Sequence, residues 1–578
     1  MISKWNYLPL TSEEQKLETA LSERFINTPS ISELLIQRGL DTEEKVEKFF
    51  KPSLADLHDP FLMPDMDKAV QRLNKAMGKK ERIMVYGDYD VDGITSVAMV
   101  YKYLRNYYSN MEYYIPTRYE EGYGISLKSI DYAHSVGVKL IIVLDCGIKA
   151  IEEIKYAKDR GIDFIICDHH VPDEELPEAV AILNPKLDNS TYPFGHLSGC
   201  GVGFKLLQAF AISNELSNNN ELYSLLDLVA ISIAADIVPM VDENRILTYY
   251  GLKRMNSNPC VGLRSIIKIC NLTSGALTIS DVIFKIGPRI NASGRMQTGM
   301  EAVELLITKD IADANERGKN IDQYNKDRKE LDKRITEEAH ALIEGRSEID
   351  SSKKTIVIYN NNWHKGIIGI VASRLTELYY KPSVVLTLSD DGLATGSSRS
   401  VQGYDIYAAI EDSRDLLENF GGHTYAVGLT LKQENISEFK RRFEAYVANT
   451  IQSDQLTPHV DIDTYLRFNE ITPEFVAELN KFNPFGPGNN KPVFCSRNVY
   501  DYGTSKIVGH NMEHIKLELI DEESNKVING IAFNMAEQYI THIKSKKPFD
   551  ICYTIEENKR RKNGQIQLLI KEIRVSEQ

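Results

Sequence analysis

The sequence predicts an α/β protein of several domains that ends in a small β-barrel, and three observations support this. From about residue 81, short apolar runs alternate with amphipathic stretches. A highly charged, proline-free stretch covers 310–346, and a second alternating region begins at 355. From about residue 457, strand-like segments are separated by polar turns. At 578 residues the chain exceeds what one core usually organises, so two to four domains are expected.

The first region contains the apolar runs RIMVYGD, KLIIVLD and DFIICD. Apolar runs without internal alternation are typical of strands buried on both faces, so they predict a parallel sheet with crossover helices. In such sheets the functional residues gather at the carboxyl ends of the strands.

The stretch 310–346 predicts one long amphipathic helix. Its apolar residues recur at helical spacing and form one narrow stripe: Tyr324, Leu331, Ile335, Ala339 and Leu342. We expect this helix to be a rigid connector.

The second region runs from TIVIYN through PSVVLTL to FGGH and predicts a smaller α/β domain. After residue 457 the segments HIKLELI, VINGIAF, FDICYTI and IQLLIKEI predict a small antiparallel barrel.

Composition places the chain among soluble globular proteins, with 42% hydrophobic and 26% charged residues. We expect a cytoplasmic protein, because neither a signal peptide nor an apolar run of about 18 residues is visible. The seven cysteines are scattered without a CxxC pair, which favours reduced thiols over disulfides or a zinc ribbon. The net charge of −14 disfavours a polyanionic substrate, but carboxylates that hold metal ions are compatible with a local basic groove.

The strongest chemical signal is YGDYDVDG, which places Asp88, Asp90 and Asp92 where an apolar strand ends. Three carboxylates so close repel one another unless cations neutralise them. Two more strands end in acids, at Asp145 and at Asp168.

His169 and His170 follow Asp168 directly, and Asp236 ends a small apolar helical run. Asp236 alone is compatible with a simple helix-terminal residue. Carboxylates combined with imidazole suit Mg²⁺ or Mn²⁺ better than zinc, whose structural sites favour thiolates.

The order DYDVDG, VLDCG, DHH and AADIVP resembles the four signature motifs of the DHH phosphoesterase superfamily. Further segments resemble the RecJ family in particular: GPRINASGRM, NWHKGIIGIVASRL, GSSRS, FGGHTYAVGL and NPFGPGN. The resemblance runs from the N-terminal segment to the last strands. It implies a single-stranded-DNA-specific 5′→3′ exonuclease of DNA repair and recombination that releases 5′ mononucleotides. It also implies a monomer, with a single-strand-binding protein and a helicase as partners and no membrane.

Two divalent metal ions, Mn²⁺ or Mg²⁺, are implied as cofactors. By resemblance, one ion is bound by four residues: Asp92, Asp145, His169 and Asp236. The second is bound by Asp90 and the bridging Asp145, with Asp88 beside it. Two ions in this arrangement can activate a water and stabilise the leaving oxygen of a phosphodiester.

The resemblance also implies that His170 faces the scissile phosphate and that Asn291 and Arg295 contact phosphate near the metals. A structural ion pair is the alternative for Arg295. The implied substrate-binding residues are Arg118, Ser397, Arg399, Gly421, Gly422 and His423. The family usually has GSGRS where this chain has GSSRS, so we expect the Ser398 side chain to narrow the pocket slightly.

We therefore predict five parts: an N-terminal segment packed on the DHH domain (1–75), the DHH domain (76–308), the connector helix (309–350), a DHH-associated domain (351–452) and an OB-fold (453–578). The run at 559–562 is consistent with a basic nucleic-acid surface of the barrel or with a simple basic turn. The nearest alternative is a DHH phosphodiesterase for oligoribonucleotides or cyclic dinucleotides, which generally lacks the OB-fold. The other is a non-catalytic single-strand-binding scaffold, which the complete set of acidic residues and histidines disfavours.

Overall fold

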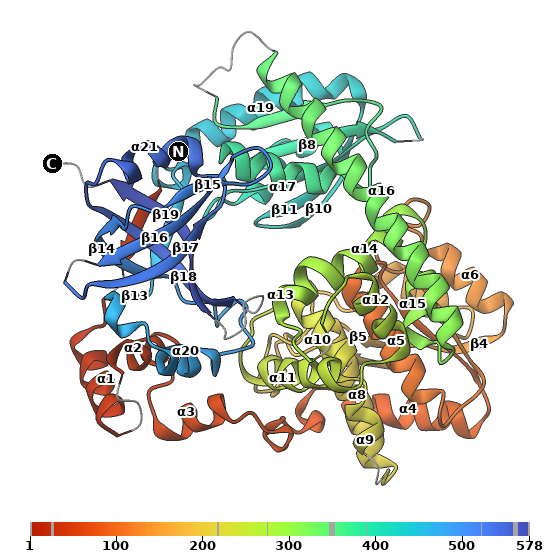
Figure 1. Cartoon of the computed structure of the whole chain (residues 1–578). Helices are drawn as coiled ribbons and strands as arrows, with labels where there is room; N and C mark the ends of the chain where they lie inside the picture. Colours follow the sequence, from red (N-terminus) through yellow and green to blue (C-terminus); the bar gives the residue numbers. More distant parts are fainter. Residues whose placement is uncertain are drawn as a thin grey trace. The chain divides into compact units, whose positions relative to one another are not determined.

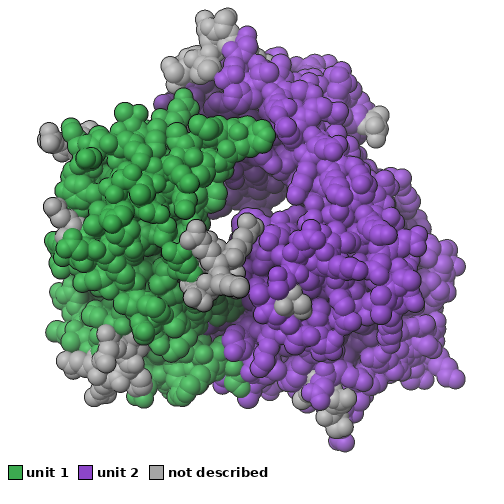
Figure 2. Space-filling view, viewed as in Figure 1, with its two compact units in different colours: residues 1–53, 457–578 green, residues 54–456 purple. Residues whose placement is uncertain are grey.

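The protein is described by a computed structural model. The described residues are 3–7, 9–24, 28–216, 219–273, 275–345, 353–389, 391–521, 523–558 and 565–575. The chain divides into two compact units (Figure 2). The larger unit is Leu54–Leu456, and the smaller combines Met1–Ser53 with Thr457–Gln578.

Five parallel strands form the first sheet of the larger unit, in the order β3-β2-β4-β5-β6 (Figure 1). They are β2 (Arg82–Gly87), β3 (Met111–Tyr114), β4 (Val138–Leu144), β5 (Asp163–Cys167) and β6 (Ala181–Leu183). The predicted parallel sheet is therefore confirmed. Because β2, β4 and β5 are neighbours, the loops after them meet at one edge of the sheet.

Helices surround this sheet and extend the domain beyond it. They are α4 (Met66–Gly78), α5 (Val91–Leu104), α6 (Leu127–Ser135), α7 (Ile151–Lys158), α8 (Gly199–Ser213), α9 (Asn219–Tyr223), α10 (Leu226–Ala235), α11 (Asp242–Ser257), α12 (Val261–Ile269), α13 (Ile279–Asp281), the π-helix η3 (Val282–Ile286), α14 (Gly287–Met296) and α15 (Met300–Ile307). The 3₁₀ turns η1 (Leu54–Asp56) and η2 (Pro60–Leu62) precede them.

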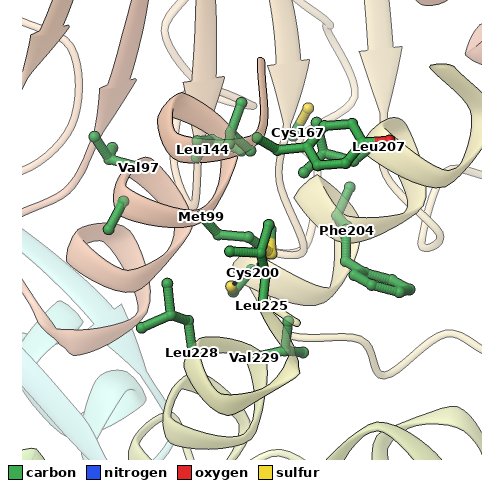
Figure 3. Packing of buried hydrophobic residues seen from close by; sticks show 14 of the residues in the cluster. Val97, Met99, Leu144, Cys167, Cys200, Phe204, Leu207, Leu225, Leu228 and Val229 are labelled. Carbon is green, nitrogen blue, oxygen red and sulfur yellow. Dashed lines mark hydrogen bonds between the residues drawn. The ribbon is translucent and has the colours of Figure 1, made fainter. Parts of the chain in front are cut away.

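Helices α5, α8 and α10 pack against one another and carry the centre of the largest core (Figure 3). Figure 3 shows the apolar side chains that meet there: Val97, Met99, Leu144, Cys167, Cys200, Phe204, Leu207, Leu225, Leu228 and Val229. Close packing fixes these three helices. It thereby fixes the residues at their ends, which form the site described below.

The predicted connector is α16 (Ile311–Glu344), the long helix labelled in Figure 1. Its apolar stripe serves two cores: Tyr324 packs against the core of the first domain, and Ile335 and Ala339 belong to the core of the second. Leu342, in contrast, is 37% exposed. Because its apolar residues pack into both cores, the helix connects the two domains.

The second domain has a mixed five-stranded sheet in the order β10-β11-β9-β8-β7, in which only β7 and β8 are parallel. Its elements are β7 (Ile356–Tyr359), α17 (Ile368–Tyr379), β8 (Ser383–Leu388), β9 (Ala394–Arg399), α18 (Ile406–Glu411), η4 (Arg414–Leu416), β10 (Leu417–His423), β11 (Ala426–Leu431), η5 (Gln433–Asn435), α19 (Ile436–Thr450) and η6 (Asp454–Leu456). The GSSRS and FGGH motifs thus lie on strands of one sheet.

The smaller unit contains the predicted C-terminal barrel. Its strands close through the order β14-β18-β19-β17-β16 and the additional β14–β16 pairing, and β17 and β19 are parallel rather than antiparallel. The elements are β12 (His459–Ile462), β13 (Thr464–Tyr465), η7 (Phe468–Glu470), α20 (Pro473–Asn480), β14 (Phe494–Asp501), β15 (Lys506–Val508), β16 (His514–Asp521), β17 (Lys526–Ala532), α21 (Ala536–Lys544), β18 (Phe549–Asn558) and β19 (Gln565–Val575).

The N-terminal segment differs from the prediction that residues 1–75 pack on the DHH domain. Residues 1–53 belong to the unit of the barrel, where β1 (Lys4–Tyr7) pairs with β12. The helices α1 (Ser12–Arg24), α2 (Pro29–Gln37) and α3 (Glu43–Phe50) place apolar side chains in the core of that unit. The reason is that β12 offers a free edge to β1 and that α2 buries one apolar face. Residues from Leu54 to Leu456 belong to the larger unit.

The predicted basic run at 559–562 lies outside the described residues. Within the described part of the chain, every helix is too short or too polar to cross a membrane.

Candidate active site

Acidic residues follow three neighbouring strands of the first sheet. Asp88 follows β2, Asp145 follows β4 and Asp168 follows β5. Asp90 caps α5, because its Oδ1 accepts a hydrogen bond from the Gly93 main-chain N–H at 3.1 Å. Gly93 is needed there, since a Cβ would lie 2.2 Å from the carbonyl oxygen of Asp88.

Asp92, in the first turn of α5, is held in place by the start of α8. Its carboxylate accepts hydrogen bonds from the main-chain N–H groups of Gly199 (2.7 Å) and Cys200 (2.8 Å) and from the Ser232 hydroxyl (2.7 Å). A Cβ on Gly199 would lie 2.6 Å from the Cβ of Asp145, so this contact also requires glycine. The carboxylate of Asp92 therefore has little freedom to turn.

The predicted metal ligands converge on His169. Its Nε2 lies 3.2 Å from Oδ1 of Asp145 and 3.5 Å from Oδ2 of Asp236, which caps the end of α10. The ligand atoms of Asp92, His169 and Asp236 all lie within 4.8 Å of one another, and so do those of Asp145, His169 and His170. His170, which we did not expect to be a ligand, is therefore also close to this cluster.

The carboxylates of this cluster resist ionisation together. Burial and the charges of the neighbouring aspartates raise the pKa of Asp92 to about 6 and of Asp236 to about 8. The same causes raise the pKa values of Asp88 and Asp145 well above the ordinary range. Asp90 contributes to all four shifts. Divalent cations would remove this repulsion.

Two buried atoms of the cluster point to a ligand. Oδ1 of Asp88 and Nε2 of His169 have no hydrogen-bond partner among the described residues. Burial and the nearby His170 lower the pKa of His169 to about 3, which keeps its imidazole neutral and its lone pair available. A hydrogen bond to the main chain of Leu197 orients the ring. Carboxylate oxygens with one imidazole nitrogen fit Mn²⁺ or Mg²⁺.

His170 is oriented by Asp168 rather than by the cluster. Its Nδ1 lies 2.7 Å from Oδ1 of Asp168, a fully buried carboxylate. Burial opposes ionisation of Asp168, but hydrogen bonds from His170 and from main-chain N–H groups outweigh it and lower its pKa to about 2. Burial lowers the pKa of His170, whereas Asp168 raises it above the ordinary value and prevails.

A second cluster gathers guanidinium groups from distant parts of the chain: Arg118, Arg295, Arg328 and Arg399. Burial and the charges of the other three lower the pKa of Arg295 to about 9. Arg295 donates to the carbonyl of Gly366 (2.9 Å), and Arg118 lies over the ring of Tyr89 at 4.2 Å.

Among the described residues, no carboxylate forms an ion pair with Arg118, Arg295 or Arg399, so the structural ion pair considered for Arg295 is absent there. Two buried atoms also lack a hydrogen-bond partner among the described residues: the donor Nε of Arg118 and the acceptor Oδ1 of Asn291. The cluster therefore has the charge, and in Arg118 a free donor, for an anion.

The second domain contributes β9 and β10 to the site. Ser397 and Arg399 lie on the same face of β9, and Nη1 of Arg399 donates to Oγ of Ser397 at 3.0 Å. Ser398 faces the opposite side, where it is fully buried and bonded to the main chain of Val427. The expectation that Ser398 narrows the pocket is therefore wrong, because residues alternate between the two faces of a strand.

The FGGH residues have different roles. A Cβ on Gly421 would meet nothing within 4 Å, so open space lies over it. Gly422 has a positive φ of 150°, and a Cβ there would lie 2.2 Å from the carbonyl of Ala426, which is a structural requirement of the β10–β11 turn. The ring of His423 lies parallel to that of His170, 6.3 Å away.

The chain has clear relatives among known proteins. It is 36% identical over 565 residues to the single-stranded-DNA-specific exonuclease RecJ of Bacillus subtilis, and the match covers 98% of this chain and 70% of that relative. It is 30% identical to the protein of the same name from Haemophilus influenzae, over 96% of this chain and 98% of the relative.

This chain belongs to the RecJ family. Three family models match this RecJ-family chain: "DHH family, N-terminal domain" over residues 82–233, "DHHA1 domain" over 352–449 and "RecJ OB domain" over 462–572. The crystal structure of RecJ in complex with Mn²⁺ from Thermus thermophilus superimposes with a TM-score of 0.83 at 25% identity, over 100% of this chain and 80% of that one.

A cavity of about 960 Å³ lies between the two domains of the larger unit. His170 lines it from the first domain, together with Tyr123 and Lys149. Asn419 and Gly421 line it from the second. In this RecJ-family chain the cavity gives a ligand access to His170 from the side of the DHHA1 sheet.

Three site residues escaped the sequence interpretation. Asp168 was visible at a strand end, but its role in orienting His170 was not. Arg328 lies among many charged residues of α16, and nothing in the sequence separates it from them. Tyr123, between two glycines in EEGYG, carries the one signal that was available, because paired glycines often mark a constrained turn.

Proposed function

We propose that this chain is a metal-dependent exonuclease that degrades single-stranded DNA from the 5′ end and releases 5′ mononucleotides. The observation that carries the proposal is the pair of clusters within one compact unit: a carboxylate and imidazole centre, and four arginines of which three lack a carboxylate partner among the described residues. The RecJ relatives are named as exonucleases specific for single-stranded DNA.

The residues proposed to hold metal ions are Asp90, Asp92, Asp145, His169 and Asp236, with Asp88 beside them. The protein crystallised from Thermus thermophilus is a complex with Mn²⁺, which supports Mn²⁺ or Mg²⁺ as the cofactor here. When bound, the ions supply Lewis-acid chemistry for attack by water on a phosphodiester. The bonds from α8 hold the Asp92 carboxylate, and the main chain of Leu197 holds the His169 ring.

His170 is proposed to act on the scissile phosphate. Asp168 fixes Nδ1, so Nε2 is the atom that can donate a proton or a hydrogen bond to the leaving oxygen. Asn291 and Arg295 are proposed to bind phosphate oxygens beside it. Arg295 has a charge that no described carboxylate neutralises, and the side-chain NH₂ of Asn291 is the group of that residue that can donate to a phosphate oxygen.

Polarity requires recognition of the strand end, because two metal ions and a water have no preference for a 5′ terminus. We propose that Arg118, Ser397 and Arg399 bind the terminal 5′ phosphate. Charge-assisted bonds from arginine to phosphate contribute about 1.5–3 kcal/mol. Gly421, Gly422 and His423 would then line the path of the strand along the DHHA1 sheet, and Gly422 also shapes the β10–β11 turn.

The smaller unit is proposed to bind the strand further from its end, as OB-folds do by stacking bases on aromatic rings. An enzyme that degrades only unpaired strands depends on other proteins to supply an unpaired end. A helicase and a single-strand-binding protein are therefore the proposed partners. The proposed domain limits are those predicted above, except that residues 1–53 are assigned to the unit of the barrel.

The test uses single strands, duplexes and RNA of one sequence, labelled at either end, with Mn²⁺ or with EDTA. We expect 5′-labelled single strands to release labelled mononucleotide at once, and 3′-labelled strands to shorten stepwise. EDTA should stop both reactions. The proposal would be contradicted if 5′-labelled strands shortened stepwise from their 3′ ends, or if duplexes were cleaved as fast as single strands.

End recognition is tested separately with Arg399→Ala. We expect a loss of roughly 10- to 100-fold on 5′-phosphorylated strands and a smaller loss on 5′-hydroxyl strands. Arg441→Ala is the matched control, because Arg441 pairs with Glu438 on the surface of the same domain. Equal slowing on both substrates would place Arg399 at an internal phosphate.

A further inference from the structure

Tyr123 is a site residue that the proposed function does not yet use. It lies in the loop between β3 and α6 and lines the cavity beside His170. The residue is 56% exposed, although its hydroxyl reaches into the site. An exposed tyrosine ring whose hydroxyl is hydrogen-bonded inside the site points to a role for that hydroxyl in the site.

The loop around Tyr123 is built to hold it. The glycines on either side, Gly122 and Gly124, have positive φ values of 82° and 83°, which other residues rarely adopt. The buried hydroxyl of Tyr86, on β2, donates to the carbonyl of Gly124 at 2.6 Å. Tyr123 is thereby anchored to the strand that leads to Asp88.

The hydroxyl of Tyr123 contacts two functional residues at once. It donates to the main-chain carbonyl of Asp145 at 3.2 Å. It also lies 3.4 Å from Nε2 and 3.5 Å from Nδ1 of His170. Because the hydroxyl is nearly equidistant from the two ring nitrogens, it does not lie on the axis of either N–H group. It therefore contacts the ring while its own proton goes to Asp145, and the Nε2 proton of His170 stays available for the substrate.

The ring of Tyr123 extends this relationship toward the arginine cluster. It meets the ring of Tyr89 edge-on, with centroids 6.4 Å apart. Arg118 lies over the ring of Tyr89. It meets the ring of His170 at 6.0 Å in the same edge-on manner. Tyr123 therefore lies between the residues proposed to bind the 5′ phosphate and those proposed to act on the scissile bond.

We propose that Tyr123 is a positioning residue whose hydroxyl ties the imidazole of His170 to the strand end that carries Asp145. It keeps the ring at a fixed place relative to the metal ligands, and this role rests on the proposed function. Asp168 fixes which nitrogen of His170 faces the substrate, and Tyr123 fixes where that nitrogen lies. Two contacts on different atoms restrain a ring that either contact alone would leave free to pivot.

The first experiment compares Tyr123→Phe with the wild-type chain under saturating Mn²⁺. Loss of one positioning hydrogen bond should lower kcat about 3- to 10-fold and change KM less than about twofold. Tyr156→Phe is the matched control, because it also removes a tyrosine hydroxyl bond, to Asp131 at 2.9 Å, on the surface of the same domain. The control should retain wild-type kcat.

The second experiment asks whether Tyr123 acts through His170. In a His170→Ala background, measured in single turnovers with excess enzyme, Tyr123→Phe should cause no further loss beyond about twofold. Affinity for Mn²⁺, measured by calorimetric titration, and the melting temperature should match those of the wild-type chain.

Several results would overturn the inference: an unchanged kcat, losses that multiply in the double variant, or a fall in Mn²⁺ affinity or melting temperature. If Tyr123→Phe is fully active while the wild-type chain degrades single strands, the role of Tyr123 is wrong and the proposed function stands. If the wild-type chain itself does not cleave, both fail together.

Discussion

Nδ1 of His170 lies 2.7 Å from Oδ1 of Asp168, and that carboxylate also accepts the main-chain N–H groups of His169 at 2.7 Å and of Ile148 at 3.0 Å. Its lone pairs are thus used for hydrogen bonds rather than for a metal ion. Asp168, the acid that follows β5, therefore orients His170. The DHH motif combines one such residue with a candidate ligand and a candidate catalytic group.

Asp168→Asn should lower kcat roughly 10²-fold or more, because an amide cannot accept from His170 and from the main chain in the same way as a carboxylate. Mn²⁺ affinity should change far less, since His169 and Asp145 remain. Steady-state kinetics and calorimetric titration measure the two effects. Glu178→Gln, which affects an exposed ion pair with Lys158 away from the cavity, is the control. Activity within twofold of wild type would remove Asp168 from this role.

Metal removal should make stability depend on pH through Asp236. Its pKa is raised to about 8 by burial and by the charges of Asp92 and Asp90, whereas the unfolded chain has the ordinary value of 3.8. The folded protein thus keeps a proton that the unfolded chain releases. This stabilisation is full below about pH 4 and is lost as the pH rises through about 8. We expect the melting temperature in EDTA to fall between about pH 4 and pH 8 and to level off above that.

Two comparisons check that expectation. Asp236→Asn has no such proton to lose, so its melting temperature should fall less steeply over the same range. Saturating Mn²⁺ should stabilise the wild-type chain most at the upper end of the range, because the ion replaces the protons. Identical slopes for the two proteins in EDTA would mean that Asp236 does not carry the effect.

Much of the fold was predictable because each element has its own periodicity. The uninterrupted apolar runs of β2, β4 and β5 identified the parallel sheet, and the narrow stripe identified α16. The packing of residues 1–53 was not predictable, because the pairing of β1 with β12 joins segments more than four hundred residues apart. Nothing local in either segment indicates its partner.

For the site, the acids and histidines that follow β2, β4 and β5 were predictable from strand ends, whereas Asp236 ends a helix. The side of the strand that Ser398 faces was not recognised, although alternation along β9 determines it once Ser397 and Arg399 are placed on the pocket side. Contacts such as those of Tyr123 and Arg328 were beyond reach, since they depend on how separate loops and helices meet in space.

Ser398→Gly, which restores the pattern usual in the family, should leave kinetics unchanged within about twofold. The side chain faces away from the cavity and bonds the main chain of Val427. Its loss, with the added freedom of a glycine in a strand, should cost about 1–3 kcal/mol in the free energy of unfolding. Urea denaturation measures this cost. A gain in activity would show that Ser398 does constrain the pocket.

A buried ion pair should be essential to the larger unit. Lys205 and Glu243 are both fully buried, and Nζ of Lys205 lies 2.9 Å from Oε1 of Glu243. Glu243 also accepts from the main-chain N–H of His58 (3.0 Å) and from the Tyr192 hydroxyl. Lys205→Met should destabilise folding by about 3–5 kcal/mol, because it leaves a buried carboxylate without its counter-ion.

Urea denaturation of Lys205→Met and of the double variant Lys205→Met/Glu243→Gln measures that cost. The double variant should recover part of the loss, since the uncompensated charge is gone. If the single variant is as stable as the wild-type chain, the pair contributes only packing.

The arginine cluster has a consequence for how the protein behaves before it meets a substrate. Arg118, Arg295, Arg328 and Arg399 come from a loop, two helices of the DHH side and connector, and a strand of the DHHA1 sheet. Each repels the others, so the fold must hold the four together against their own charge. Under the proposed function, a phosphate of the substrate placed among them would replace this repulsion with attraction to a shared anion. We therefore expect these arginines to be held more firmly in the substrate complex than in the free protein, because the phosphate balances their charge.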